Sequence, residues 1–156
     1  MIQRIQSLFL LGTLAACIAC FFLPFWIYTG PDYAYQVSLF AVKLTTNGNA
    51  QYLFVSTIPI IVIMSVSAIL AIVSIFYYKN RLLQIKINTY NLFLTLIFIG
   101  TIYLWIPYMI EEKLPNATRS WQCGLILPLF SLIFLILANK FIKKDENLVR
   151  SADRLR

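Results

Sequence analysis

Long uncharged, apolar stretches alternate with short charged segments along this chain. The stretches without a charged residue run over 5–31, 44–78, 87–110 and 120–139. Each has about 20 residues or more, the length at which a helix crosses the hydrocarbon core of a bilayer. The pattern predicts an all-α membrane protein, a bundle of four transmembrane helices at about 5–28, 53–78, 87–110 and 121–140.

Helices are predicted, rather than the strands of a barrel, because the apolar runs are continuous. Lipid offers no partner to backbone polar groups outside a helix or a closed barrel. The strands of a barrel would alternate polar and apolar positions in short segments. Composition agrees with a membrane protein, since 60% of the residues are hydrophobic and only 12% are charged, about half the usual share for soluble domains.

The first apolar stretch also has features of an export signal. Arg4 precedes it, and the residues from Leu14 to Cys17 match a lipoprotein cleavage site. A cleaved signal normally gives way to polar sequence, whereas here the apolar residues continue to Trp26 and Tyr28. We therefore expect an uncleaved first span.

Positive charge is concentrated on one side of the predicted membrane. That side carries the whole net charge of +7, and its cations are Arg4, Lys79, Arg81, Lys86, Lys140, Lys143, Lys144, Arg150, Arg154 and Arg156. On the other side Lys43, Lys113 and Arg119 are balanced by Asp32, Glu111 and Glu112. Because cytoplasmic loops are enriched in Lys and Arg, both termini are predicted to be cytoplasmic. The chain then divides into a transmembrane domain, 1–142, and a basic helical tail, 143–156.

The longest outer loop, 29–52, has the composition of a β-hairpin. Residues 33–45 are rich in strand formers, and Thr46-Asn47-Gly48-Asn49 follows them. Asn-Gly is a strong hairpin signal because both residues tolerate positive φ. We expect a small hairpin over the outer ends of the helices.

Four prolines lie in the outer halves of the predicted spans: Pro24, Pro59, Pro107 and Pro128. A proline removes a backbone hydrogen bond and bends a helix. Four bends at one level could open an outer cavity, which would suit a small transporter, channel or lipid-binding protein. The alternative is that prolines near helix ends are simply tolerated in packing, and we favour it.

Cys17 and Cys20 form a C-x-x-C pair, with Cys123 at the outer start of the fourth span. Such a pair raises the remote alternative of a quinone-linked thiol oxidoreductase. Cys17, however, falls near the middle of the bilayer, where nothing stabilises a thiolate, and a second cysteine pair is missing. Packing of small apolar side chains explains these residues better.

Enzyme chemistry has little support in the sequence. The chain has no histidine, no carboxylate inside a predicted span and no glycine-rich phosphate loop, so we expect no catalytic residue, no metal and no cofactor. Asn91 in the third span is expected to face Ser74 or another span as a contact between helices.

The tail is predicted to be an amphipathic helix. Glu146 and Arg150 are spaced i, i+4, and Phe141, Leu148, Ala152 and Leu155 form a narrow apolar stripe. The tail could lie on anionic lipid headgroups or dock on a protein. Nucleic acid is the least favoured ligand, and DNA is not expected.

Three segments resemble a known family: Met1 to Ser7, Arg81 to Asn88, and Leu148 to Arg156. They are similar to a family of small four-span proteins of Bacteroidota, catalogued as domain of unknown function 4293. The resemblance covers essentially the whole chain. It implies a multi-pass protein of a bacterial inner membrane and carries no activity, cofactor or catalytic residue.

All three segments fall on the predicted cytoplasmic side. They include Arg4, Arg81, Lys86, Arg150, Arg154 and Arg156, close to Lys79, Lys143 and Lys144. Because guanidinium groups form directional bonds, this basic face suits a specific partner better than lipid alone. The sequence therefore favours a non-enzymatic accessory subunit of a larger inner-membrane complex, with a machine for secretion or protein insertion as one candidate. This subunit is expected to contact anionic headgroups and other integral membrane proteins.

Overall fold

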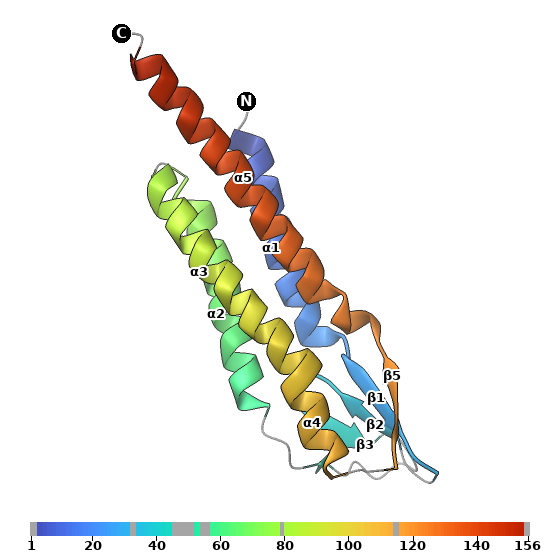
Figure 1. Cartoon of the computed structure of the whole chain (residues 1–156). Helices are drawn as coiled ribbons and strands as arrows, with labels where there is room; N and C mark the ends of the chain where they lie inside the picture. The colour runs from blue at the N-terminus through green and yellow to red at the C-terminus, as the bar shows by residue number, and fades with distance from the viewer. Residues whose placement is uncertain are drawn as a thin grey trace.

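The computed structural model describes residues 3–31, 34–44, 52–53, 57–78, 80–113 and 116–154. Four long helices lie side by side: α1 (Gln3–Phe22), α2 (Ile58–Phe76), α3 (Arg81–Gly100) and α5 (Leu127–Arg154). α3 continues through a π-helical turn, η1 (Thr101–Trp105), into α4 (Ile106–Glu111). A small sheet lies at one end of the bundle and both termini lie at the other (Figure 1). We call these the sheet end and the terminal end.

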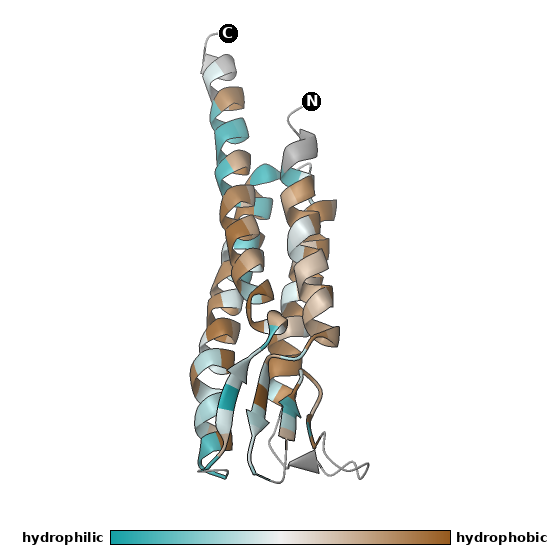
Figure 2. Ribbon diagram, turned by 90° about the vertical axis from the view of Figure 1, so that its right-hand side faces the viewer, coloured by the Kyte–Doolittle hydropathy of each residue, from teal (hydrophilic) through white to brown (hydrophobic). Residues whose placement is uncertain are grey.

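The helices pack in a ring. α1 contacts α5 and α2, and α3 contacts α2 and α5. Within the described ranges, three helical segments are long and apolar enough to cross a membrane: Ile58–Phe76, Arg81–Glu111 and Cys123–Val149. The apolar part of α1, Gln6–Phe22, is shorter. Figure 2 shows apolar residues along the helices and hydrophilic ones gathered on α5 toward the terminal end.

The first predicted helix, 5–28, is wrong at its outer end. α1 ends at Phe22, and Trp26–Thr29 forms strand β1. Pro24 explains the change, since it lacks an N–H group and disfavours helical geometry in the residue before it. Hydropathy did not distinguish this strand from a helix because both are apolar.

The other helix boundaries also differ from those predicted. α3 begins at Arg81 rather than at 87, because the polar face of its first turns is buried in the bundle. Trp121, predicted to start the fourth span, ends strand β5 (Thr118–Trp121). The helix follows only after a 3₁₀ turn, η2 (Cys123–Leu125).

The predicted hairpin belongs to a five-stranded antiparallel sheet with the order β4-β3-β2-β1-β5. β2 (Ala34–Val37) and β3 (Val42–Leu44) form a hairpin, and Tyr52–Leu53 is β4. The turn of that hairpin is closed by Ser38, whose backbone N–H donates to the Ala41 carbonyl at 3.0 Å. The predicted turn at 46–49 lies outside the described residues, between β3 and β4.

The strand register gives the sheet one buried face. Trp26 pairs with Val37 and Tyr28 with Tyr35, so these four side chains share a face. Trp26, Tyr28 and Val37 are buried, in one cluster with residues of α3, η1 and α4. The sheet and the outer part of the α3–η1–α4 segment therefore form a compact layer beyond the ends of α1 and α2.

Candidate functional site

The predicted basic residues are gathered at the terminal end where the structure describes their side chains. Lys86, Lys140, Lys143 and Lys144 are exposed on α3 and α5. Arg81 is half-buried, and its guanidinium donates to the backbone oxygen of Asp145 at 3.0 Å. The side chains of the remaining predicted cations lie outside the described part: Arg4, Lys79, Arg150, Arg154 and Arg156.

Asp145 is a buried carboxylate that sequence reasoning missed. It is 5% exposed, and the Gln6 side-chain amide of α1 donates to its carboxylate. Among the described residues, no Lys or Arg forms a salt bridge with it. The spacing gave a signal, since Ser131, Ala138 and Asp145 recur every seven residues along the buried face of α5. Because its neighbours in the sequence are charged, Asp145 was assigned to the basic tail and not to the helix interface.

A polar node joins all four long helices near the middle of the bundle. The Asn91 amide of α3 donates to the Ser67 backbone oxygen at 3.1 Å, and the Ser67 hydroxyl donates to Asn91 Oδ1 at 2.6 Å. The Cys17 sulfur of α1 lies 3.8 Å from the Ser67 hydroxyl and 4.0 Å from that of Ser131 in α5. Asn91 was predicted to contact Ser74 or another span, and its partner is Ser67 of α2.

Closer to the terminal end, the buried polar side chains are only partly paired. The Gln84 amide nitrogen donates to the Ser74 backbone oxygen at 2.9 Å. Both polar atoms of the Asn88 amide, the Ser74 hydroxyl, Gln84 Oε1 and Asn139 Oδ1 have no hydrogen-bond partner in the described part of the protein. This unpaired group lies between the Asn91 node and Asp145.

The cysteines occupy two different settings. Cys17 and Cys20 are free thiols with no exposed surface, and Cys123 is a free, exposed thiol near the start of α5. Both buried cysteines belong to an apolar cluster. In the parts of the chain that are described, no group of three or more His, Cys, Asp or Glu residues is placed to hold a metal.

The four prolines do not form one level of helix bends. Pro24 lies between α1 and β1, whereas Pro59 and Pro128 stand in the first turns of α2 and α5, where no helical hydrogen bond is lost. Pro107 and Pro128 are buried, Pro24 is half-buried and Pro59 is exposed. The carbonyl oxygen of Pro24 accepts the Gly124 N–H at 3.1 Å, which ties β1 to the turn before α5.

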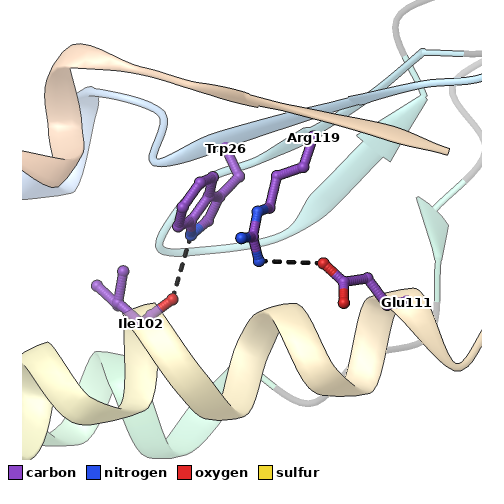
Figure 3. A network of polar contacts seen from close by, with 4 residues as sticks. All are labelled: Trp26, Ile102, Glu111 and Arg119. Atoms are coloured by element: carbon purple, nitrogen blue, oxygen red, sulfur yellow. Dashed lines mark hydrogen bonds and ion pairs between the residues drawn. The ribbon is translucent and has the colours of Figure 1, made fainter.

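The sheet end contains a polar network centred on Trp26 (Figure 3). The Ile106 N–H donates to the Thr101 oxygen five residues earlier, and Pro107 has no N–H to donate. The Ile102 carbonyl is thus left without a helical partner, and the indole N–H of Trp26 donates to it at 3.1 Å. The carbonyl left free by the π-helical turn is therefore the group to which the sheet is hydrogen-bonded through Trp26.

Arg119 completes this network from the edge strand β5. Its guanidinium lies 4.7 Å from the centre of the Trp26 ring and forms a 3.0 Å salt bridge with Glu111 of α4. Tyr28 stands opposite Arg119 on the neighbouring strand. Burial raises the pKa of Tyr28 to about 12, the Glu111 carboxylate adds to the rise, and Arg119 partly offsets it. The arrangement fixes the sheet on α4.

The fold and these sites define a predominantly helical protein with apolar helices of membrane-spanning length and a small antiparallel sheet. The chain belongs to the family described as domain of unknown function DUF4293, which it matches over residues 2–155. The predicted family is thereby confirmed. A comparison with curated proteins found no match.

Proposed function

We propose that this chain is a non-enzymatic, four-span protein of a bacterial inner membrane, and that it docks a protein partner on its terminal end. In this proposal both termini are cytoplasmic. The observation that carries it is the course of α5, which runs without a break from Leu127 to Arg154 and extends past the ends of the neighbouring helices (Figure 1).

The continuous helix favours a protein over a lipid surface. A tail bound flat on a membrane would have to turn away from the bundle axis near Lys143. Instead, α5 keeps its direction for about ten residues after Lys144, or roughly 15 Å at 1.5 Å per residue. Leu148 and Val149 on that extension are 51% and 44% exposed. In this proposal the extension is directed away from the bilayer, so a protein rather than lipid covers these two side chains.

Charge indicates the chemistry of the partner. One exposed face of α5 carries Lys140, Lys143, Lys144, Asn147 and Leu148, which combines cations with one apolar side chain. An acidic amphipathic segment matches both features, because its carboxylates pair with the lysines while an apolar side chain covers Leu148. The lysines nearest the bundle also contact anionic headgroups in this arrangement.

Site-specific photocrosslinking in cells tests the proposal. A photoreactive residue at position 148 should yield a discrete adduct with an identified acidic protein, and the same residue at position 43 at the sheet end should not. Replacing Lys140, Lys143 and Lys144 together by Gln should reduce the adduct about tenfold or more, since opposite charges steer and hold the partner. Replacing the exposed Lys43 by Gln is the matched control and should leave it unchanged.

Two results would overturn the proposal. One is an adduct at position 148 that contains only lipid or a second copy of the chain. The other is a protein adduct whose yield does not depend on the three lysines.

A further inference from the structure

One face of α3 changes from polar to apolar along the bundle. Gln84, Asn88, Asn91 and Thr95 are buried at alternating spacings of four and three residues. The same spacing continues into the sheet half with Phe98 and Ile102, also buried. A repeat of this kind is the seam by which a helix packs on its neighbours. The polar half of the seam is the half nearer the terminal end.

Two asparagines on this seam differ in their surroundings. Asn91 exchanges two hydrogen bonds with Ser67 and leads to Cys17. Asn88, one turn away, has no exposed surface and no hydrogen-bond partner among the described residues for either its oxygen or its nitrogen. Unlike Asn91, Asn88 is therefore not held in the interior by a hydrogen bond to another described residue.

Further buried polar atoms without a partner among the described residues lie on three helices, at positions between the node and Asp145. They are the Ser74 hydroxyl of α2, Gln84 Oε1 of α3 and Asn139 Oδ1 of α5. Ser74 is fixed beside Gln84 by the 2.9 Å bond from the Gln84 amide to its backbone oxygen. Asn139 falls on α5 between Ser131, at the node, and Asp145.

The chemistry of these atoms specifies what would satisfy them. Three are amide oxygens that only accept, Ser74 both donates and accepts, and the Asn88 nitrogen only donates. A buried amide or hydroxyl without a partner destabilises the folded state, so several together in a membrane helix bundle favour a small molecule that both donates and accepts. Water has this property and a size suited to gaps between helices.

A polar route connects the cluster with the terminal surface. Arg81, Gln84 and Asn88 lie on successive turns of α3. Arg81 donates to the backbone oxygen of Asp145, whose carboxylate accepts from Gln6. Arg81 also lines a surface groove of about 600 Å³ with Asn80, Leu82, Leu83, Glu146 and Val149. Beyond Asn91, Phe98 and Ile102 make the interior apolar.

We propose that the terminal half of the bundle interior is a water-binding vestibule that opens at the terminal end and is closed at the Asn91–Ser67–Cys17–Ser131 node. Asn88 is its central ligand-binding side chain. Ser74, Gln84 and Asn139 complete its polar lining.

Thiol labelling of the full-length protein in native membranes tests the vestibule. The background is a Cys123→Ser variant, in which the two remaining cysteines are fully buried. Asn88→Cys places a thiol in the vestibule, and Phe98→Cys places one on the same seam beyond the node. A small cationic methanethiosulfonate should modify Asn88→Cys at least roughly ten times faster than Phe98→Cys, because the thiolate forms only in contact with water. Equal rates for the two variants would overturn the proposal.

A second pair of variants does not depend on the cysteines. Asn88→Asp places a carboxylate among water molecules, and Asn91→Asp places one in the closed node, where it faces Ser67 and Cys17. We expect Asn88→Asp to retain a higher melting temperature than Asn91→Asp in detergent. A melting temperature for Asn88→Asp equal to or below that of Asn91→Asp would contradict a hydrated Asn88.

Discussion

The two ends of this bundle treat their buried polar groups differently. At the sheet end, the Ile102 carbonyl left free by the π-helical turn is matched by the Trp26 indole, and Arg119 is held by Trp26 and Glu111. Among the described residues there, the buried Tyr28 hydroxyl has no hydrogen-bond partner. At the terminal end, Asn88 and Gln84 are buried and Asn139 is half-buried, and each has a buried side-chain atom without a hydrogen-bond partner among the described residues. Paired polar groups fix one geometry, whereas unpaired ones need a ligand or water. More of the unpaired buried atoms of the described residues lie at the terminal end, which is where the proposed vestibule is placed.

The largest loss of stability is expected from adding a side chain at Gly124, where the turn before α5 contacts the Pro24 carbonyl just before β1. A Cβ on Gly124 would lie below 3.0 Å from the Pro24 carbonyl, a backbone group that cannot rotate away. Gly124→Ala should lower the unfolding free energy by about 3 kcal/mol or more, within the range of severe overpacking. Thermal unfolding in detergent measures it. Gly100→Ala is the matched control, because a Cβ there meets nothing within 4 Å, and an equal loss in both variants would contradict the contact.

Removing the indole donor of Trp26 should have the next largest effect. Trp26→Phe keeps an aromatic ring but leaves the buried Ile102 carbonyl unpaired, at a cost of about 1–3 kcal/mol. Trp121→Phe is the control, since Trp121 is 70% exposed. Guanidine unfolding should separate the two variants. If both lose the same stability, the π-helical turn does not anchor the sheet.

Truncating the two seam asparagines compares the paired and the unpaired amide directly. Asn91→Ala should cost about 1–2 kcal/mol, because it breaks both bonds to Ser67 between α2 and α3. Asn88→Ala should cost less than half as much, since it breaks no bond within the described protein. Melting temperatures in the same detergent give the ranking. A larger loss of stability for Asn88→Ala than for Asn91→Ala would contradict the assignment of Asn91 as the paired amide and Asn88 as the unpaired one.

The smallest effect is expected from alkaline pH at the sheet end. The pKa of Tyr28 is about 12 in the folded protein against an ordinary value of 10.0. The unfolded chain therefore releases this proton first, and stability present below pH 10 is lost as the pH rises toward 12. The loss between pH 10 and 11 should be about 1 kcal/mol. Tyr28→Phe should reduce the pH dependence of thermal unfolding in this window, and an unchanged slope would show that Tyr28 is not the responsible group.

The two ends of the bundle could be predicted only in part from the sequence. Charge-free stretches predicted the helices, and the cations on one side predicted the basic end. Trp26–Thr29 and Thr118–Trp121 were assigned to a helix, a loop or a span start, because a short apolar strand and a helix end have the same hydropathy. Their pairing across about ninety residues is a long-range contact that no local pattern carries.

The sequence by itself determined the apolar helices, the concentration of positive charge and the family, since each depends on residue types along a single segment. Only the tertiary structure decided which polar residues are paired. Asn88 and Asn91 have the same side chain on the same face of the same helix. Within the described residues, the helices around them give a partner to Asn91 and none to Asn88. A hydrogen bond between helices depends on their relative placement, which is set by the whole core.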